Sequence, residues 1–323
     1  MKGILRGRHE RRRAQRTLKT MMVSVEALEP RTALSGGNVT VQLSGPDWKI
    51  TGDDNPNAIT LTPLSNGAIR VTGGASTGGT TTVNGKTYAD FVPSGNVSVT
   101  LKDGDDKLML QGSSSRQLRF PSGLTLSMGR GIDTVVGSYV YAGRTLNVDM
   151  GIESQGVGYE TAAFNNADVG GVTYRTDRTA GANSFEMSIC TVRGDVSITG
   201  SNGQNSVSLG SVNVSGSLTA SMGSEPNNST TSDIFSMTSS AVAGRVQLDM
   251  GEGRGQATFT RIAADTIDVL FGGSDADQLG FSDSNVRRAR FDGGHGNNDR
   301  IWGGRNVFRE KLDIVRFEKN ELR

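Results

Sequence analysis

The fold is decided by the stretch Leu126-Ser-Met-Gly-Arg-Gly-Ile-Asp-Thr-Val135. Apolar residues alternate with polar ones up to a glycine turn, a single Asp follows, and the alternation then resumes. An apolar period of two predicts a β-strand with one buried face. Glycine can adopt a positive φ in the turn without a Cβ clash. The stretch therefore predicts a strand, a tight turn and a second strand.

Variants of this unit recur along the chain every 20 to 28 residues, a spacing typical of solenoids and propellers. Aligned on the polar position after each turn glycine, the units fall at Asp106, Asp133, Gly158, Asn183, Asn205, Asp233, Ala257, Asp277 and Asp299. Eight of the nine residues two positions later are apolar, and Glu160 is the exception. An apolar residue at a fixed offset predicts a stack of inward-facing side chains.

Each unit carries a second break, such as Ser215-Gly216 or Ala243-Gly244, so it holds two short strands and two turns. A propeller blade needs four strands and about 40 residues or more, which is longer than this unit. We therefore predict an all-β fold, a single elongated right-handed parallel β-solenoid (β-helix) of about ten coils. The handedness follows the usual crossover preference. The aligned Asp and Asn residues would form a ladder at the coil spacing of about 4.8 Å.

The chain divides into four predicted parts. Residues 1–35 form a basic segment, and residues 36–96 form an N-terminal β cap with the first irregular coils, including a hairpin turn at Asn84-Gly85. Residues 97–302 are the main repeat, and residues 303–323 are a C-terminal cap made of a strand or a short helix. Caps are expected because the end of a solenoid otherwise exposes unpaired strand edges.

Charge and cysteine content exclude several classes of protein. Residues 1–35 hold nine basic and three acidic residues, which leaves 25 basic and 30 acidic residues in the body. A mildly acidic body argues against nucleic-acid binding through a basic face. Cys190 is the single cysteine, so no intrachain disulfide forms, and the local alternation predicts an outward-facing thiol. The chain contains no apolar run of 18 residues, so the sequence predicts no transmembrane helix.

The basic N-terminal segment ends in Leu28-Glu29-Pro30-Arg31-Thr32-Ala33-Leu34-Ser35. This stretch, after its Arg-rich lead, resembles the LEPR-XLL motif of large exported planctomycete proteins. The family has two leucines after the variable position, whereas this chain has Ala33 and Leu34. The resemblance covers about a tenth of the chain and implies a sorting signal that is read by export machinery and then cleaved or left disordered. It implies an exported protein, at the cell surface or outside the cell, and no particular chemistry.

Two turns near the C-terminus suggest a metal site. Gly272-Gly-Ser-Asp-Ala-Asp-Gln-Leu279 and Gly293-Gly-His-Gly-Asn-Asn-Asp-Arg-Ile301 resemble the GGxGxDxUx nonapeptide of RTX proteins, which bind Ca²⁺ between stacked turns. The resemblance implies Asp275, Asp277, Asp292 and Asp299 as calcium ligands, with weaker candidates at Asp103, Asp105, Asp106 and Asp133. The nonapeptides are not in tandem, and Asp275 stands where the family has glycine. Turn formation by Asp and Asn is the alternative interpretation.

No sequence motif assigns catalysis. The chain has no HExxH, CxxC, P-loop or GxSxG pattern, and His295 is the only histidine in the body. We therefore predict no catalytic residue, and no cofactor unless the RTX resemblance extends to Ca²⁺. The predicted function is a non-catalytic exported protein with a structural or adhesive role toward cell-surface glycan or matrix components. The alternatives are an RTX-like calcium-binding surface protein and a β-helix polysaccharide lyase or hydrolase using paired carboxylates.

Overall fold

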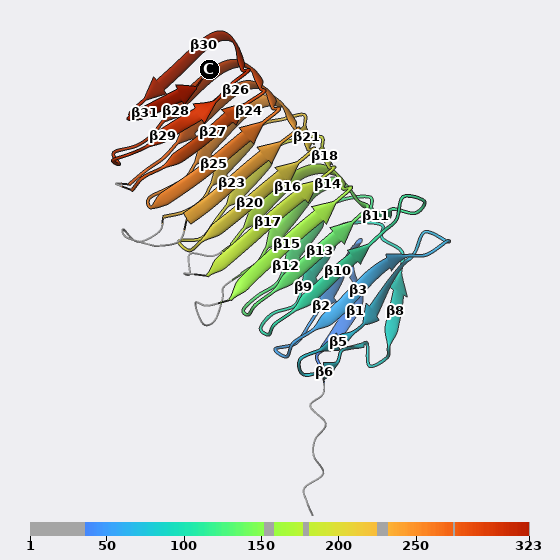
Figure 1. The fold of residues 1–323 in the computed structure, drawn as a ribbon. Coiled ribbons are helices and arrows are strands. Elements are labelled where there is room, and N and C mark those ends of the chain that lie inside the picture. The colour runs from blue at the N-terminus through green and yellow to red at the C-terminus, as the bar shows by residue number, and fades with distance from the viewer. Residues whose placement is uncertain (1–35, 152–157, 177–180, 225–231, 274, 323) are drawn as a thin grey trace, which may run out of the picture. The chain divides into compact units, whose positions relative to one another are not determined.

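A computed structural model describes residues 36–151, 158–176, 181–224, 232–273 and 275–322. These residues contain no helix, and their strands stack as parallel coils into a β-solenoid of about nine turns (Figure 1). The predicted all-β parallel solenoid is confirmed, with about one coil fewer than expected. The sorting segment predicted at residues 1–35 lies outside the described residues.

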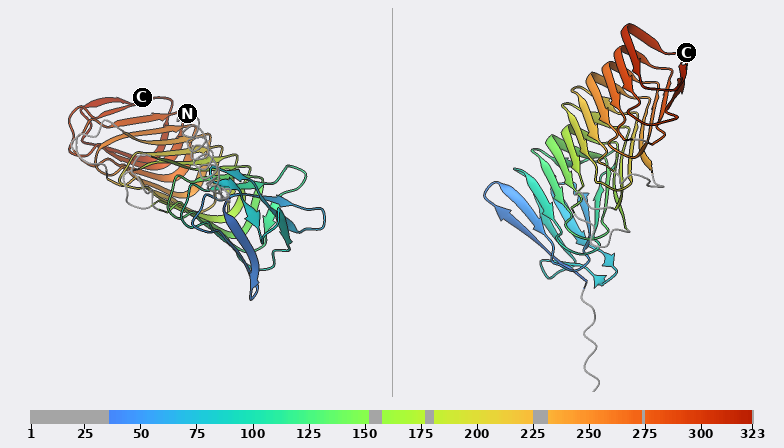
Figure 2. Two further views of the ribbon diagram at one scale, coloured as in Figure 1. Left: turned by 90° about the horizontal axis from the view of Figure 1, so that it is seen from below. Right: turned by 90° about the vertical axis from the view of Figure 1, so that its left-hand side faces the viewer.

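Each coil contributes strands to two facing sheets, and Figure 2 shows the coils stacked in chain order. Among the described residues, sheet 1 has 16 strands. They are β1 (Asn38–Ser44), β2 (Asp47–Thr51), β7 (Thr82–Val83), β9 (Val97–Thr100), β11 (Leu118–Phe120), β12 (Leu124–Ser127), β14 (Val140–Asp149), β16 (Asp168–Arg175), β18 (Thr191–Val192), β19 (Val196–Thr199), β21 (Asn213–Val214), β22 (Leu218–Ser221), β24 (Ala241–Asp249), β26 (Ala263–Leu270), β28 (Asn285–Asp292) and β30 (Val307–Val315).

Sheet 2 has 13 strands over the same ranges. They are β3 (Ala58–Pro63), β4 (Ile69–Gly73), β8 (Tyr88–Phe91), β10 (Lys107–Gln111), β13 (Thr134–Ser138), β15 (Tyr159–Asn165), β17 (Ala182–Ser188), β20 (Asn205–Gly210), β23 (Ser232–Thr238), β25 (Arg254–Thr260), β27 (Gln278–Ser282), β29 (Arg300–Gly303) and β31 (Lys319–Leu322). A small separate hairpin joins β5 (Ala75–Ser76) to β6 (Gly79–Thr80).

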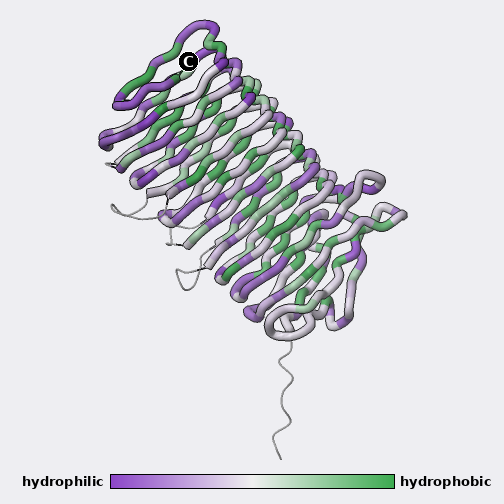
Figure 3. The backbone as a smooth tube through the Cα atoms, viewed as in Figure 1, coloured by the Kyte–Doolittle hydropathy of each residue, from purple (hydrophilic) through white to green (hydrophobic). Residues whose placement is uncertain are grey.

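The core lies between the two sheets and runs without a break from Val39 to Ile301. Figure 3 shows hydrophobic stretches in green recurring from coil to coil between pale and purple ones, and the strands alternate buried with exposed residues, as expected for one buried face. Among stacked positions, Phe281 pairs directly with Phe259, and their ring centroids lie 5.9 Å apart. Phe235 pairs with Ala257, and its ring lies 5.5 Å from that of Phe259, two residues further along the neighbouring strand. The predicted inward stack at a fixed offset is therefore confirmed.

Strand register corrects two positions of the aligned series. Thr134 pairs with Thr161, which places Glu160 opposite Asp133 where the alignment had Gly158. Asp233 pairs directly with Gly255, where the alignment had Ala257. The residues two positions later are then Ala162 and Ala257, and both are fully buried. Glu160 is thus a ladder residue, and the one exception to the inward apolar stack disappears.

The turn from sheet 2 back to sheet 1, called here the left-handed corner, uses one residue of positive φ per coil. These residues have φ between 51° and 59° and are Tyr139, Asn166, Ile189, Ser211, Ser239, Arg261, Asp283 and Arg305. The left-handed residue interrupts the alternation, so the residue after it points inward. The prediction of an outward Cys190 is wrong for this reason: Cys190 is 1% exposed, and Ile189 is 58% exposed.

The two ends of the described solenoid are built differently. At the N-terminal end, β2 and β3 form a first coil that pairs with β9 and β10, while β1, β4 and β8 add antiparallel strands beside it. The Asn84-Gly85 turn closes a hairpin as predicted, with both residues at positive φ. At the other end β30 and β31 form a further coil, so the strand alternative for residues 303–323 is confirmed.

Candidate functional site

The first candidate is the turn from sheet 1 to sheet 2, called here the acid corner, where most coils bury one polar side chain, Gly255 and the exposed Glu318 being the exceptions. Register aligns Asn57, Asp106, Asp133, Glu160, Asn183, Asn205, Asp233, Gly255, Asp277, Asp299 and Glu318. The predicted Asp/Asn ladder is therefore present along this edge. Asp133, Asp277 and Asp299 are fully buried, and Asp106 is 2% exposed.

Hydrogen bonds connect the ladder from coil to coil. The backbone N–H of one ladder residue donates to the side-chain oxygen of the next, from Asn57 to Asp106 at 2.6 Å and from Asp106 to Asp133 at 2.8 Å. The same bond joins Gly255 to Asp277 at 2.7 Å and Asp277 to Asp299 at 2.9 Å. Each such carboxylate therefore satisfies a backbone donor that the turn would otherwise leave without an acceptor.

Removal from water dominates the electrostatics of the acid corner. Burial raises the pKa of Asp106 to about 8, that of Asp133 to about 7 and that of Asp277 to about 8. Burial also raises the pKa of Asp299, and a neighbouring ladder carboxylate adds to the rise at Asp106 and Asp277. The buried carboxyl groups of Asp106 and Asp277 are therefore mostly protonated at pH 7.

The asparagines of the same ladder show what a ladder side chain contacts. Nδ2 of Asn57 donates to the carbonyls of Asp53 and Asn55, four and two residues earlier, and Nδ2 of Asn205 does the same with Ser201 and Gly203. An aspartate has the oxygen Oδ2 in place of the asparagine Nδ2. Within the described ranges, the Oδ2 atom has no protein partner in four ladder aspartates, which are Asp106, Asp133, Asp277 and Asp299. A protonated Oδ2 can donate as Asn does, whereas an ionised one cannot.

The predicted calcium ligands do not converge on one point. Asp277 and Asp299 adjoin through the ladder, and Asp275 lies near enough to raise the pKa of Asp277 further. Asp292 accepts a 2.6 Å bond from Arg316; although burial opposes it, this contact lowers the pKa of Asp292. Within the described ranges no group of three or more His, Cys, Asp or Glu is arranged to hold a metal.

The weaker calcium candidates are split between the interior and the surface of the first repeat. Asp106 and Asp133 are ladder residues, whereas Asp103 and Asp105 are exposed in the preceding turn. Asp105 accepts a 3.0 Å bond from the backbone N–H of Ile132 in the next coil. Its charge also raises the pKa of Asp106 and Asp133. Of these four residues, the structure thus buries two and uses Asp105 to connect turns.

Cys190 belongs to a second internal ladder at the left-handed corner. Its Sγ accepts from the backbone N–H of Ala167 at 3.4 Å and donates to the carbonyl of Ser188 at 3.2 Å. Ser240 and Ser284 make the equivalent pair of bonds with their hydroxyl groups. Burial raises the pKa of the Cys190 thiol. Cys190 therefore acts as a structural corner residue of the same kind as these serines.

The second candidate is a surface feature that the sequence did not predict. Sheet 1 bends where the register shifts, with one extra residue in β24 and one in β30, and a groove of about 500 Å³ follows the bend over consecutive coils. This bend groove is lined by Asn213, Val214, Ser215, Ala241, Val242, Ala243, Ala263, Ala264, Asp265, Asn285, Arg287 and Arg309. β-Bulges commonly reshape a sheet beside a binding site.

Glycine lies at the bend at Gly216 and Gly244. A Cβ at Gly216 would lie 2.7 Å from the carbonyl oxygen of Gly194, and one at Gly244 would lie 2.9 Å from that of Gly216. In later coils the same bend carries Asp265 and Arg287 instead. The charged residues of the groove lining are Asp265, Arg287 and Arg309, so they lie toward its C-terminal end.

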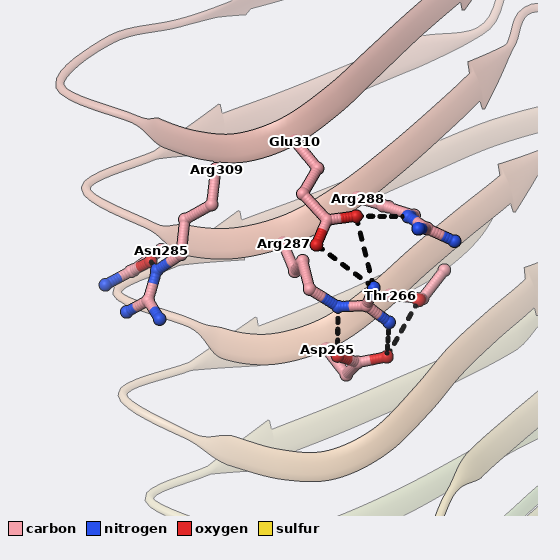
Figure 4. A network of polar contacts seen from close by, with 7 residues as sticks. All are labelled: Asp265, Thr266, Asn285, Arg287, Arg288, Arg309 and Glu310. Carbon is pink, nitrogen blue, oxygen red and sulfur yellow. Dashed lines mark hydrogen bonds and ion pairs between the residues drawn. The ribbon is translucent and has the colours of Figure 1, made fainter.

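Figure 4 shows these charged groups. Arg287 holds Asp265 with two bonds of 2.6 and 2.7 Å and contacts Glu310 at 3.1 Å. Its contact lowers the pKa of Asp265, so Asp265 is ionised and neutralised in place. Arg309 donates through Nε to Asn285 Oδ1 at 2.9 Å and makes no ion pair within the described ranges. Its two terminal NH₂ groups thus remain available at the groove.

The comparisons with known proteins add no relative. No protein-family model matches the chain, and neither the curated proteins nor the solved structures include a match. In the part of the chain that the structure describes, no helix is long and apolar enough to cross a membrane. The LEPR-XLL and RTX resemblances therefore stay predictions from the sequence.

Proposed function

We propose that the chain is a non-catalytic exported protein that acts as a structural or adhesive rod at the cell surface or in the extracellular matrix. The bend groove carries this proposal, because it runs along consecutive coils of one continuous solenoid. Extended surfaces of this kind are what repeat proteins use for binding. The groove suits a long ligand such as a cell-surface glycan or a matrix polymer. The export part rests on the sorting-motif resemblance of residues 28–35.

Location is the direct test of this proposal. The full chain, with an epitope tag at its C-terminus, would be expressed in the organism that encodes it, and intact cells would be treated with protease. We expect the tag to be lost from intact cells and the untreated rod to fractionate with matrix material. The variant Arg31→Ala, altered in the sorting motif, should stay inside. A tag protected in intact cells but cleaved after lysis would contradict the proposal.

One observation favours the RTX-like calcium-binding surface protein as a second candidate. Oδ2 of Asp277 and Oδ2 of Asp299 are buried and lack a protein partner within the described ranges, and hard cations bind carboxylate oxygens. Thermal unfolding of the full chain with millimolar Ca²⁺ and with excess EDTA tests it, because a ligand of the folded state raises the midpoint. Identical midpoints would exclude it. No contact among the described residues favours the polysaccharide lyase or hydrolase, which stays a prediction.

A further inference from the structure

We infer that the bend groove binds a carboxylated polysaccharide, with Arg309 contacting its carboxylate groups. This inference names the ligand of the proposed adhesive function and rests on it. Arg309 uses one of its five N–H groups on Asn285, and its remaining donors border the groove. A planar guanidinium matches a carboxylate with two parallel hydrogen bonds, the arrangement that Arg287 already makes with Asp265.

The charge of the bend groove favours an anionic ligand. Its lining holds two arginines and one carboxylate; Arg287 is engaged by that carboxylate and by Glu310, so the uncompensated positive charge of the lining is that of Arg309. The groove is therefore locally positive on a body that has 25 basic and 30 acidic residues from residue 36 onward. A basic surface on an otherwise acidic molecule draws anions to that one place. The carboxylate of Asp265 does not repel an anionic ligand strongly, because its charge is neutralised by the ion pair with Arg287.

The other lining residues favour a sugar chain over other polyanions. Asn213, Ser215 and Asn285 present amide and hydroxyl groups, which suit sugar hydroxyls, and the alanines between them leave room for a chain. None of the described residues that line the groove is aromatic, whereas single-stranded nucleic acids are held largely by stacking on aromatic rings. The lining likewise lacks the aromatic pocket that usually anchors a protein partner. A polysaccharide fits these features best.

Calorimetric titration of the full chain with oligogalacturonate of defined length tests the inference. We expect saturable binding that weakens as NaCl is raised, and at least roughly tenfold weaker binding of a neutral oligosaccharide of equal length. Arg309→Gln should weaken oligogalacturonate binding roughly tenfold. Arg254→Gln, which removes an exposed arginine from β25 in sheet 2, makes the same change in net charge and should leave binding unchanged.

A second pair of variants tests the groove floor without removing any ion pair. Ala263 is exposed in the floor, and Ala263→Glu and Ala263→Gln differ in charge but hardly in size. We expect the Glu variant to bind oligogalacturonate several-fold more weakly than the Gln variant. Equal affinity of the two would show that the ligand does not lie on this floor and would overturn the inference.

Other ligands give distinct results. Binding of a sulfated oligosaccharide or of single-stranded DNA as tightly as oligogalacturonate would overturn the assignment of a carboxylated sugar, as would equal affinity for the neutral oligosaccharide. A chain that lies at the cell surface but binds no oligogalacturonate would leave the proposed function standing and reject this inference alone. A chain found only inside cells would reject the proposed function, whatever the titration shows.

Discussion

Among the residues of the acid corner, Asp106 gives the most specific prediction, which concerns the stability of the fold as a function of pH. Its pKa rises from 3.8 to about 8 in the folded protein, so folding at pH 7 requires the carboxyl group to take up a proton. With 1.36 kcal/mol for each pH unit between 3.8 and 7, that uptake costs about 4 kcal/mol. Asparagine keeps the Oδ1 acceptor and supplies the Nδ2 donor without a proton. We expect Asp106→Asn to stabilise the fold at pH 7 by up to about 4 kcal/mol.

The sign of the effect depends on pH. An acid whose folded pKa is raised favours folding most below its unfolded pKa of 3.8, and that contribution is lost as pH rises toward 8. The difference between Asp106→Asn and the parent chain should therefore shrink to below about 1 kcal/mol at pH 4 and grow steadily up to pH 8. Urea unfolding followed by circular dichroism at pH 4, 5.5, 7 and 8 measures it.

The control is Asp54→Asn, which removes an exposed carboxylate from the turn that precedes Asn57. It makes the same change in charge, and we expect less than about 0.5 kcal/mol at every pH. If Asp106→Asn destabilises the chain at pH 7, or shifts stability equally at pH 4 and pH 8, the protonated-ladder explanation is wrong. Loss of stability only when calcium is present would instead identify Asp106 as a cation ligand, because an amide replaces a charged ligand by a neutral one.

Two substitutions and one labelling experiment test the fold itself. Phe259→Ala removes a fully buried ring between two other phenylalanines, and chemical denaturation should show a loss of about 3–5 kcal/mol. Gly251→Ala places a Cβ 1.4 Å from the carbonyl oxygen of Gly223 at a φ of +72°, so its thermal midpoint should fall by the equivalent of about 3 kcal/mol or more. Cys190 should react with a thiol reagent at neutral pH only as the protein unfolds, since it is buried with a raised pKa.

The fold could be predicted from the sequence because its signals are local. The turn at Asp133 can be recognised from the neighbouring glycines and the alternation on either side. Register is different, because it is set by pairing between coils. Alignment on the position after each turn glycine selects Gly158 and Ala257, whereas β15 and β25 pair so that Glu160 and Gly255 enter the ladder. The prediction of an outward Cys190 is wrong because Ile189, in the left-handed conformation, reverses the alternation of inward and outward side chains.

The bend groove could not be predicted in the same way. Its lining residues are about one coil apart, so no single window of sequence contains the site. The breaks at Ser215-Gly216 and Ala243-Gly244 indicated a second turn, but the sequence does not show that the two bends stack. In later coils Asp265 and Arg287 stand where these bends have glycine, and this change is the sequence signal of the groove. It becomes interpretable only when the register is known.

The solenoid separates what stabilises it from what can recognise a ligand. Asp106 and the other ladder groups lie inside and connect neighbouring coils, whereas Arg309 lies outside and contacts Asn285. Because Asp106 precedes β10 and Arg309 lies in β30, many coils apart in the stack, a change at one of these places should not reach the other. Arg309→Gln should then leave the free energy of unfolding within about 0.5 kcal/mol of that of the parent chain. Asp106→Asn should leave the affinity for oligogalacturonate unchanged. If either variant changed both the free energy of unfolding and the affinity for oligogalacturonate, the acid corner and the bend groove would be coupled through the coil stack. The groove could then not be treated as an independent site.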